Sequence, residues 1–134
     1  MADEQAQKFI WPCLNYTDAR TAMRYLVDVL GFEETALYTA ESGDVVTHAE
    51  ARWPEGGGVM FGSAGREDSE FSTKAVGASS VYVITDDPDS VYERAISGGA
   101  EITREMEEAD YGSRGFTVRD PEGNLFSFGT YKGE

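Results

Sequence analysis

His48 and Glu50 are the pair of side chains best suited to chemistry in this 134-residue chain. They lie two positions apart in an expected strand, so both point to the same face of it. An imidazole and a carboxylate at this spacing can bind a divalent metal, but the sequence shows no third ligand near them. We favour an arrangement in which His48 hydrogen-bonds to Glu50 or to a tyrosine in a polar cleft wall. A divalent metal near His48 and Glu50 is the competing hypothesis.

Cys13 is the only cysteine in the chain. It can form neither an internal disulfide nor a cluster of thiolate metal ligands. A Cys–His nucleophilic pair would have to join Cys13 to His48, and nothing in the sequence places them together. Ser127 has no evident activating base, and the glycines at 56–58 are not followed by a helix, as a phosphate-binding loop requires. Nucleophilic and phosphate chemistry are therefore not indicated.

Composition and charge limit the class of protein. Hydrophobic and aromatic contents of 40% and 12% are typical of one soluble globular domain at this length. No apolar run approaches the length of a membrane span, and residues 1–9 lack the layout of a signal peptide, so we expect a cytoplasmic protein with no membrane partner. A net charge of −14 repels nucleic acid and attracts cations. We therefore expect no nucleic acid partner, and a cationic ligand is compatible with the charge.

The first half of the chain predicts one helix set among strands. Thr17 or Asp18 can cap the helix, its apolar residues recur at helical spacing, and Gly31 can end it. Pro12 lacks an N–H, so the strand that contains it should lie at the edge of a sheet. The expected strands cover residues 9–16, 32–40, 45–53 and 58–62.

The second half repeats this order after a polar linker at residues 64–77. Asp87 and Pro88 can begin a second helix, and Trp11 corresponds to Ser80 in the repeat. Strand, helix and three strands thus occur twice, and an internal duplication explains this order best. The expected elements are a strand at 79–85, a helix from 87 to 98, a strand at 100–106, and a hairpin of 115–118 and 125–131.

The last hairpin carries the most specific motif. Residues 120–124, with the sequence Asp-Pro-Glu-Gly-Asn, are a strong turn between segments dense in aromatic and β-branched side chains. This hairpin resembles the C-terminal signature of the vicinal oxygen chelate superfamily, the glyoxalase, bleomycin-resistance and dioxygenase group. The resemblance covers residues 9–131. It implies an α+β fold in which two βαβββ modules, at 9–63 and 78–131, form curved mixed or antiparallel sheets around a cleft.

The resemblance also implies where a metal would bind. Metal-dependent members place one His, Gln or Glu on each of four cleft strands. None of the matching side chains in this chain is a good metal ligand, so we expect no metal in the usual place and no other cofactor. The matching positions are Trp11, Ser80, Ser127 and Phe61, with Met60 instead of Phe61 if the register differs by one residue.

What remains is a cleft lined by aromatic, sulfur-containing and a few polar side chains, with Phe126 and Phe128 expected in the core. Such a lining binds flat organic molecules, and negative charge nearby favours a cationic one. The expected ligand-binding residues are Trp11, Cys13, His48, Glu50, Met60, Phe61, Ser80, Tyr82, Tyr111, Arg114, Phe116 and Ser127.

The predicted function is metal-free binding of a small organic molecule, such as a cationic aromatic compound or an antibiotic. The resemblance to drug-sequestering members further implies a homodimer whose partner completes the cleft. Two alternatives stay open. One is a metal-dependent lyase, isomerase or dioxygenase of the glyoxalase type with His48 and Glu50 as ligands. The other is an accessory or regulatory domain that binds no small ligand, which a fully packed concave face would favour.

Overall fold

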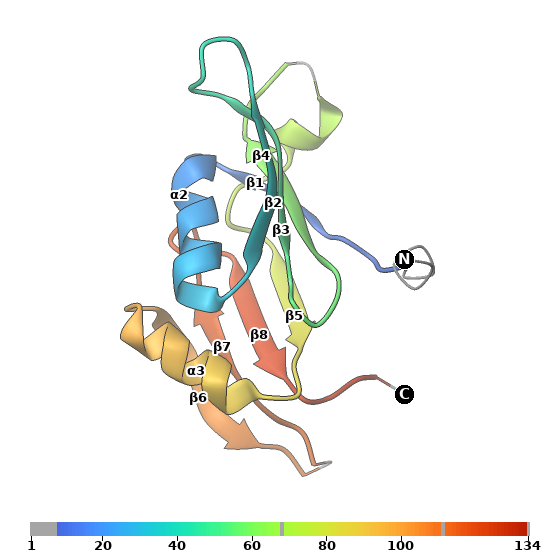
Figure 1. Ribbon diagram of the computed structural model, residues 1–134, viewed down its shortest axis with the longest axis vertical. Coiled ribbons are helices and arrows are strands. Elements are labelled where there is room, and N and C mark those ends of the chain that lie inside the picture. Colours follow the sequence, from blue (N-terminus) through green and yellow to red (C-terminus); the bar gives the residue numbers. More distant parts are fainter. Residues whose placement is uncertain (1–7, 68, 111, 134) are drawn as a thin grey trace.

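The computed structural model describes residues 8–67, 69–110 and 112–133. Two four-stranded sheets lie one above the other in Figure 1, with the helices α2 and α3 on a common side of them. The first sheet has the strand order β1-β4-β3-β2, and the second has the equivalent order β5-β8-β7-β6. This is the predicted α+β fold of a βαβββ unit used twice, and neither sheet closes on itself.

The parallel pairs are β1 with β4 in the first sheet and β5 with β8 in the second. All other neighbouring strands are antiparallel, so both sheets are mixed. β1 is an edge strand, as Pro12 predicts, but it begins only after Pro12. Pro12 has no N–H to donate, although its carbonyl still accepts a hydrogen bond from Met60 N at 2.9 Å. The strands are β1 (Cys13–Tyr16), β2 (Glu33–Thr39), β3 (Val46–Arg52), β4 (Gly58–Ser63), β5 (Ser80–Ile84), β6 (Glu101–Glu108), β7 (Arg114–Arg119) and β8 (Leu125–Gly129).

The helices begin at the predicted caps. The Asp18 side chain accepts a hydrogen bond from Thr21 N at 3.1 Å, and Asp87 caps the second helix in the same way. The first helix widens into a π-helix, which the spacing did not predict, and ends at Gly31, whose φ is +94°. No helix within the described residues is long and apolar enough to cross a membrane. The helical elements are α2 (Ala19–Arg24), the π-helix η1 (Tyr25–Leu30), the 3₁₀-helix η2 (Glu70–Thr73) and α3 (Pro88–Ser97).

Aromatic side chains join the two halves in one core. The rings of Trp53 and Phe128 lie 5.4 Å apart, and those of Phe32 and Phe126 lie 6.2 Å apart. Phe126 and Phe128 are fully buried, as predicted. Because these rings lie between the sheets and the helices, the faces of the sheets that point away from the helices have no cover from the same core.

Two Pro-Glu-Gly turns bind the halves to each other reciprocally. Glu122, in the turn between β7 and β8, accepts hydrogen bonds from Thr17 N and Asp18 N at 2.6 and 2.8 Å, where the first helix begins. Glu55, in the turn between β3 and β4, accepts one from Asp86 N at 2.8 Å, just before α3. The last turn of each half therefore binds the start of the other half's helix.

A buried hydrogen bond lies beside the turn that contains Glu122. Tyr16 Oη donates to Asp120 Oδ2 at 2.7 Å, and Asn124 Nδ2 donates to the same oxygen at 3.0 Å. Burial, together with the charge of Asp120, raises the pKa of Tyr16, so its hydroxyl stays a neutral donor. The predicted turn at 120–124 is therefore both a hairpin loop and a contact between the two halves.

Candidate functional site

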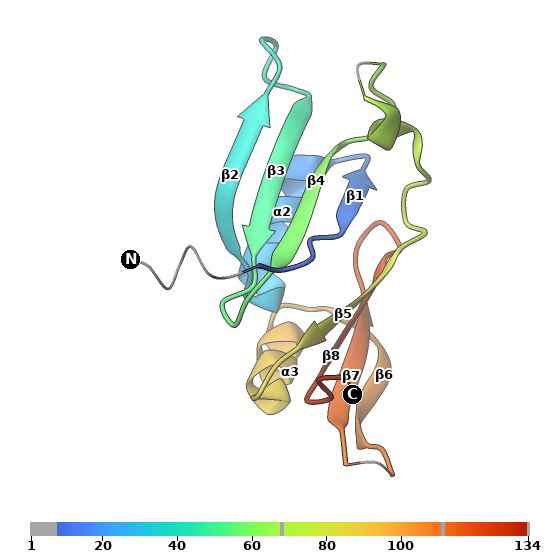
Figure 2. The ribbon, with the colours of Figure 1, turned by 90° about the vertical axis from the view of Figure 1, so that its right-hand side faces the viewer.

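We call the face of each sheet opposite its helix the open face. Figure 2 shows the first sheet from this side, with α2 behind it. Because successive side chains of a strand alternate between faces, every second residue reaches the open face. Paired residues form a matching row across each open face: Cys13, Met60, Glu50 and Ala36 in the first sheet, and Tyr82, Ser127, Thr117 and Arg104 in the second.

A cavity of about 260 Å³, which we call the first-sheet hollow, lies on the open face of the first sheet. The strands supply Cys13, His48 and Met60, and the segment at residues 64–76 supplies Arg66 and Phe71. Thus Cys13, His48 and Met60, which were predicted to bind a ligand, come together with residues that were not predicted, among them Arg66 and Phe71. The predicted Phe61 also lines the hollow, although little of it is exposed. A thiol, a thioether, an imidazole, a guanidinium and a phenyl ring share this hollow, which suits a polarisable organic ligand.

Of the two hydrogen-bond partners expected for His48, Glu50 or a tyrosine, the structure shows Glu50. His48 Nε2 lies 2.8 Å from Glu50 Oε2, and the His48 ring is stacked on Tyr38 with the ring planes 16° apart. Among the described residues, no three His, Cys, Asp or Glu side chains are close enough to hold a metal ion. Two donors on one strand are fewer than a protein metal site needs, so the side chains of the described residues do not fit the metal site of the competing hypothesis.

The open face of the second sheet has a different chemistry. A cavity of about 230 Å³ there is lined by Tyr82, Arg104 and other side chains. The hydroxyls of Thr117 and Ser127 lie 2.8 Å apart and are hydrogen-bonded to each other. The Tyr82 side chain lies over Gly129. A methyl group at Gly129 would be only 2.8 Å from Tyr82 Oη, so the absence of a side chain there leaves room for the tyrosine. This face therefore offers a ring and hydroxyl groups where the first sheet offers sulfur, imidazole and carboxylate.

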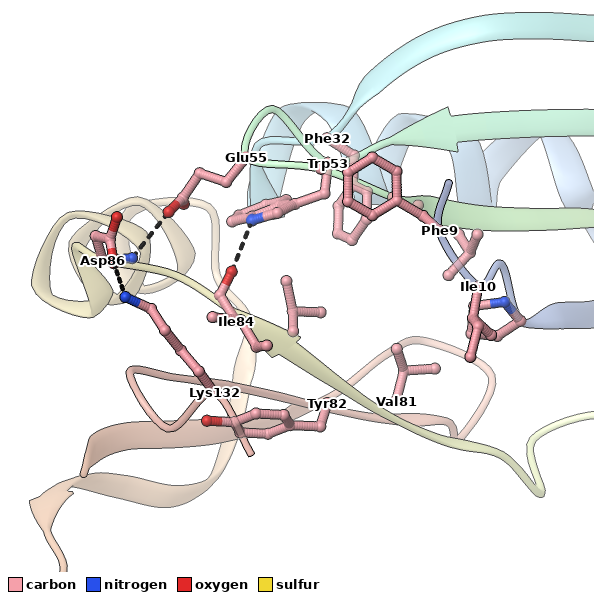
Figure 3. A pocket seen from close by; sticks show the side chains of 16 residues that line it. Phe9, Ile10, Phe32, Trp53, Glu55, Val81, Tyr82, Ile84, Asp86 and Lys132 are labelled. Carbon is pink, nitrogen blue, oxygen red and sulfur yellow. Dashed lines mark hydrogen bonds and ion pairs between the residues drawn. The ribbon is translucent and has the colours of Figure 1, made fainter. Parts of the chain in front are cut away.

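A larger cavity than these two, about 450 Å³, is a groove at the junction of the two sheets, which we call the junction groove. Figure 3 shows Phe32 and Trp53 on one wall, with Tyr82 and Ile84 across from them. Phe9 also lies against this groove, over the turn between β3 and β4. Its lining is mainly apolar, and it extends the core toward the surface.

The polar groups around the junction groove already have partners within the chain. Trp53 Nε1 donates to Ile84 O at 3.2 Å, and Lys132 forms an ion pair with Asp86 at 3.1 Å (Figure 3). Glu55 accepts the hydrogen bond from Asp86 N described above. The groove therefore offers apolar surface to a ligand, but few groups that could select one.

Three predicted ligand-binding residues lie elsewhere than on an open face. Phe61 is 4% exposed and packs edge-on against Tyr16, so the alternative register with Met60 on the open face is the correct one. Phe116 is fully buried and stacks on Phe128. Arg114 has the same strand parity as Phe116 and pairs with Asp89 of α3 at 2.7 Å, on the helix side.

The remaining predicted residues have mixed positions. Trp11 is half-buried, and its ring lies against Gly58, because a methyl group there would be 2.8 Å from Trp11 Cζ3. Ser80 is exposed at the start of β5. Ser127 is half-buried in the row described for the second sheet. Tyr111 lies outside the described residues.

Sequence reasoning missed Arg66 and Phe71, since it treated residues 64–77 as a linker. The segment contains one aromatic residue, Phe71, in an otherwise polar and charged stretch. An isolated large apolar side chain in such a stretch is the signal that could have indicated a role. Phe71 is 60% exposed and lines the first-sheet hollow, so its side chain lies on the open face of the first sheet.

Comparisons with known proteins agree with this architecture. A family model described as the glyoxalase/bleomycin resistance protein/dioxygenase superfamily matches residues 8–128. The crystal structure of TioX from Micromonospora sp. ML1 is similar over 94% of this chain and 100% of its own, with 28% identity and a TM-score of 0.80. No curated protein matches the sequence significantly.

Two further solved structures share the fold at lower identity. A glyoxalase/bleomycin resistance protein/dioxygenase superfamily member from Sphaerobacter thermophilus has 21% identity and a TM-score of 0.66, with 92% of this chain and 97% of its own covered. A glyoxalase/bleomycin resistance protein from Streptomyces sp. CB03234 has 19% identity and a TM-score of 0.67, with 87% and 94% covered. At these identities the likeness concerns the fold.

Proposed function

The chain belongs to the glyoxalase/bleomycin resistance protein/dioxygenase superfamily, and from this premise we propose that it binds a small organic molecule in the first-sheet hollow without a metal and without turnover. One observation carries the proposal. Cys13, Met60 and Phe71 surround a cavity of about 260 Å³, and the adjacent histidine is hydrogen-bonded to Glu50. Soft, polarisable side chains around a cavity favour binding of a ring system over acid–base chemistry.

The junction groove is larger, but it is the weaker candidate for selective binding. Its volume of about 450 Å³ is lined by core side chains, and its polar groups already contact each other. A ligand there would gain apolar contact only. The first-sheet hollow adds groups that can distinguish one ligand from another, since an imidazole and a guanidinium line it and a carboxylate lies beside it.

A flat cationic compound is the class of ligand that we propose. The net charge of −14 creates a field that attracts cations to the surface. Within the hollow, the Phe71 ring can contact a cationic ring system, and Glu50 is two residues from His48 on the same face. Antibiotics and other natural products with charged aromatic groups belong to this class.

We also propose that the protein acts as a homodimer. Neither α2 nor α3 covers the open faces, and Tyr82 and Ile84 on β5 are 46% and 41% exposed. A second copy placed against these faces would bury such side chains and would set a hydroxyl-bearing sheet opposite the first-sheet hollow. Sedimentation of the purified protein measures this directly, and a monomer at micromolar concentration would contradict it.

Binding is tested with two flat cationic fluorophores, thioflavin T and ethidium, by fluorescence titration and calorimetry. We expect saturable binding to the wild-type protein and weaker binding to Met60→Ala. Ile96→Ala is the matched control, because Ile96 is a 49% exposed apolar side chain on α3, which lies on the helix side of the second sheet, away from the first-sheet hollow. If wild type binds the fluorophores and Met60→Ala binds them with equal affinity, the binding site is not the first-sheet hollow.

A further inference from the structure

Hydrogen bonds join several described residues of the segment 64–76 to one another, on both sides of residue 68. Gly65 N donates to Ser72 O at 2.8 Å, and Ser72 Oγ donates to Ser69 O at 2.9 Å from a side chain that is 1% exposed. Ala64 N donates to Tyr16 O at 3.0 Å, which fixes the start of the segment to β1. The segment therefore folds on itself and returns toward the first sheet.

Asn15 attaches the far part of this segment to the sheet. Its Nδ2 donates to Phe71 O at 2.6 Å and to Lys74 O at 3.2 Å, and the residue is only 8% exposed. Both hydrogen atoms of the amide are therefore used on two carbonyls of the segment, at and just beyond η2. Two nearly buried hydrogen bonds of this kind define the position of Phe71 relative to β1.

The neighbouring strand leaves room for this arrangement. Asn15 pairs with Gly62 of β4, which has no side chain. The Arg66 guanidinium lies over the same glycine, because a methyl group at Gly62 would be 3.2 Å from Arg66 Nη2. Arg66 Nε also donates to Ser63 O at 3.0 Å. Asn15 and Arg66 thus hold the two ends of one wall of the first-sheet hollow, and Phe71 is the ring on that wall.

We propose that Asn15 is a positioning residue for ligand binding: its amide holds Phe71 at the rim of the first-sheet hollow, so that the Phe71 ring forms a stacking wall for a flat ligand. This inference rests on the proposed function, since it concerns the same hollow. Asn15 lines the hollow itself, but both N–H groups of its amide donate to the segment, so the amide nitrogen has no hydrogen left for a ligand. It acts through Phe71, whose side chain is 60% exposed at the hollow.

A double-mutant cycle with thioflavin T separates this role from a general structural one. The variants are Asn15→Ala, Phe71→Ala and the combination of both. Loss of a stacking ring costs on the order of tenfold in affinity, so we expect each single variant to weaken binding about tenfold. Because Asn15 acts through Phe71, the double variant should also be about tenfold weaker than wild type, and not a hundredfold. Ile96→Ala serves again as the control.

The outcomes are distinguishable from a failure of the proposed function. If wild-type protein binds neither thioflavin T nor ethidium, the proposed function fails and the role of Asn15 fails with it. If wild type binds but Asn15→Ala does not change the affinity, or if the two single effects multiply in the double variant, the positioning role is wrong while the binding function stands. Should Asn15→Ala not fold, Asn15→Ser takes its place, since its one hydroxyl can replace at most one of the two hydrogen bonds.

Discussion

The reciprocal contacts of the two Pro-Glu-Gly turns lead to a quantitative prediction about Glu122. Its carboxylate accepts two backbone hydrogen bonds, at 2.6 Å from Thr17 N and 2.8 Å from Asp18 N. Hydrogen bonds to a charged group are worth about 1.5–3 kcal/mol each when water is excluded. Glu122 is only half-buried, so water can bond to the two N–H groups after truncation and recover part of this free energy. We therefore expect Glu122→Ala to lower the free energy of unfolding by about 2 kcal/mol.

Urea unfolding followed by circular dichroism measures this change. Glu122→Gln should lose less, because an amide oxygen can still accept from one of the two N–H groups. Glu93→Ala is the matched control for removal of a negative charge, since Glu93 is exposed on α3, and its unfolding free energy should stay within about 0.5 kcal/mol of wild type. Glu55→Ala should have a smaller effect than Glu122→Ala, because Glu55 is exposed.

The denaturant dependence adds a second test of the same reasoning. In the variant with both Glu55→Ala and Glu122→Ala, the reciprocal contacts are lost at both junctions. If these contacts couple the two halves, the transition should broaden and its m-value should fall, since the halves then unfold separately. An unfolding free energy of Glu122→Ala within about 0.5 kcal/mol of wild type would refute the assigned role of this carboxylate.

Three further substitutions test other parts of the structure. Tyr16→Phe removes one of the hydrogen bonds to the buried carboxylate of Asp120, and we expect a loss of about 1–3 kcal/mol in urea unfolding. Hydrogen bonds from Arg114 lower the pKa of Asp89, so its stabilising contribution is complete above its ordinary pKa and is lost as pH falls through the lowered one. Thermal unfolding between pH 5 and pH 2 should therefore depend less on pH in Asp89→Asn. Trp11→Ala should weaken thioflavin T binding far more than it lowers stability, whereas a stability loss of about 3–5 kcal/mol would show that Trp11 is a core residue.

The fold could be predicted because its signals are local. The turn at 120–124, the helix caps at Asp18 and Asp87 and the order of strands are all visible in short stretches of sequence. The chemistry of His48 and Glu50 was equally accessible, because two residues on one strand must share a face. That constraint made their mutual hydrogen bond one of the expected arrangements, beside a tyrosine partner for His48 and a metal between the two.

The errors at the candidate site come from strand parity and from tertiary contact. A shift of one residue exchanges the two faces of a strand, so the sequence did not decide between Met60 and Phe61. For the same reason Arg114 and Phe116 were wrongly predicted to line the cleft. In the structure, β7 directs both side chains toward α3 and the core. The place of Phe71 depends on a hydrogen bond from Asn15, 56 residues away in the sequence, and no local pattern carries that information.

The contacts that hold the two halves together and the proposed binding surface lie on different sides of the sheets. The aromatic core and the two turn carboxylates join the halves on the helix side and at the junction, whereas the rows that contain Met60 and Ser127 lie on the open faces. Corresponding positions of the two rows can therefore differ in chemistry without disturbing the contacts that hold the halves together. Met60 corresponds to Ser127 and Glu50 to Thr117, which is a change from thioether and carboxylate to hydroxyl at equivalent places. A ligand that contacts both open faces would thus meet soft and charged groups on one side and hydrogen-bonding hydroxyls on the other, and this asymmetry would fix its orientation.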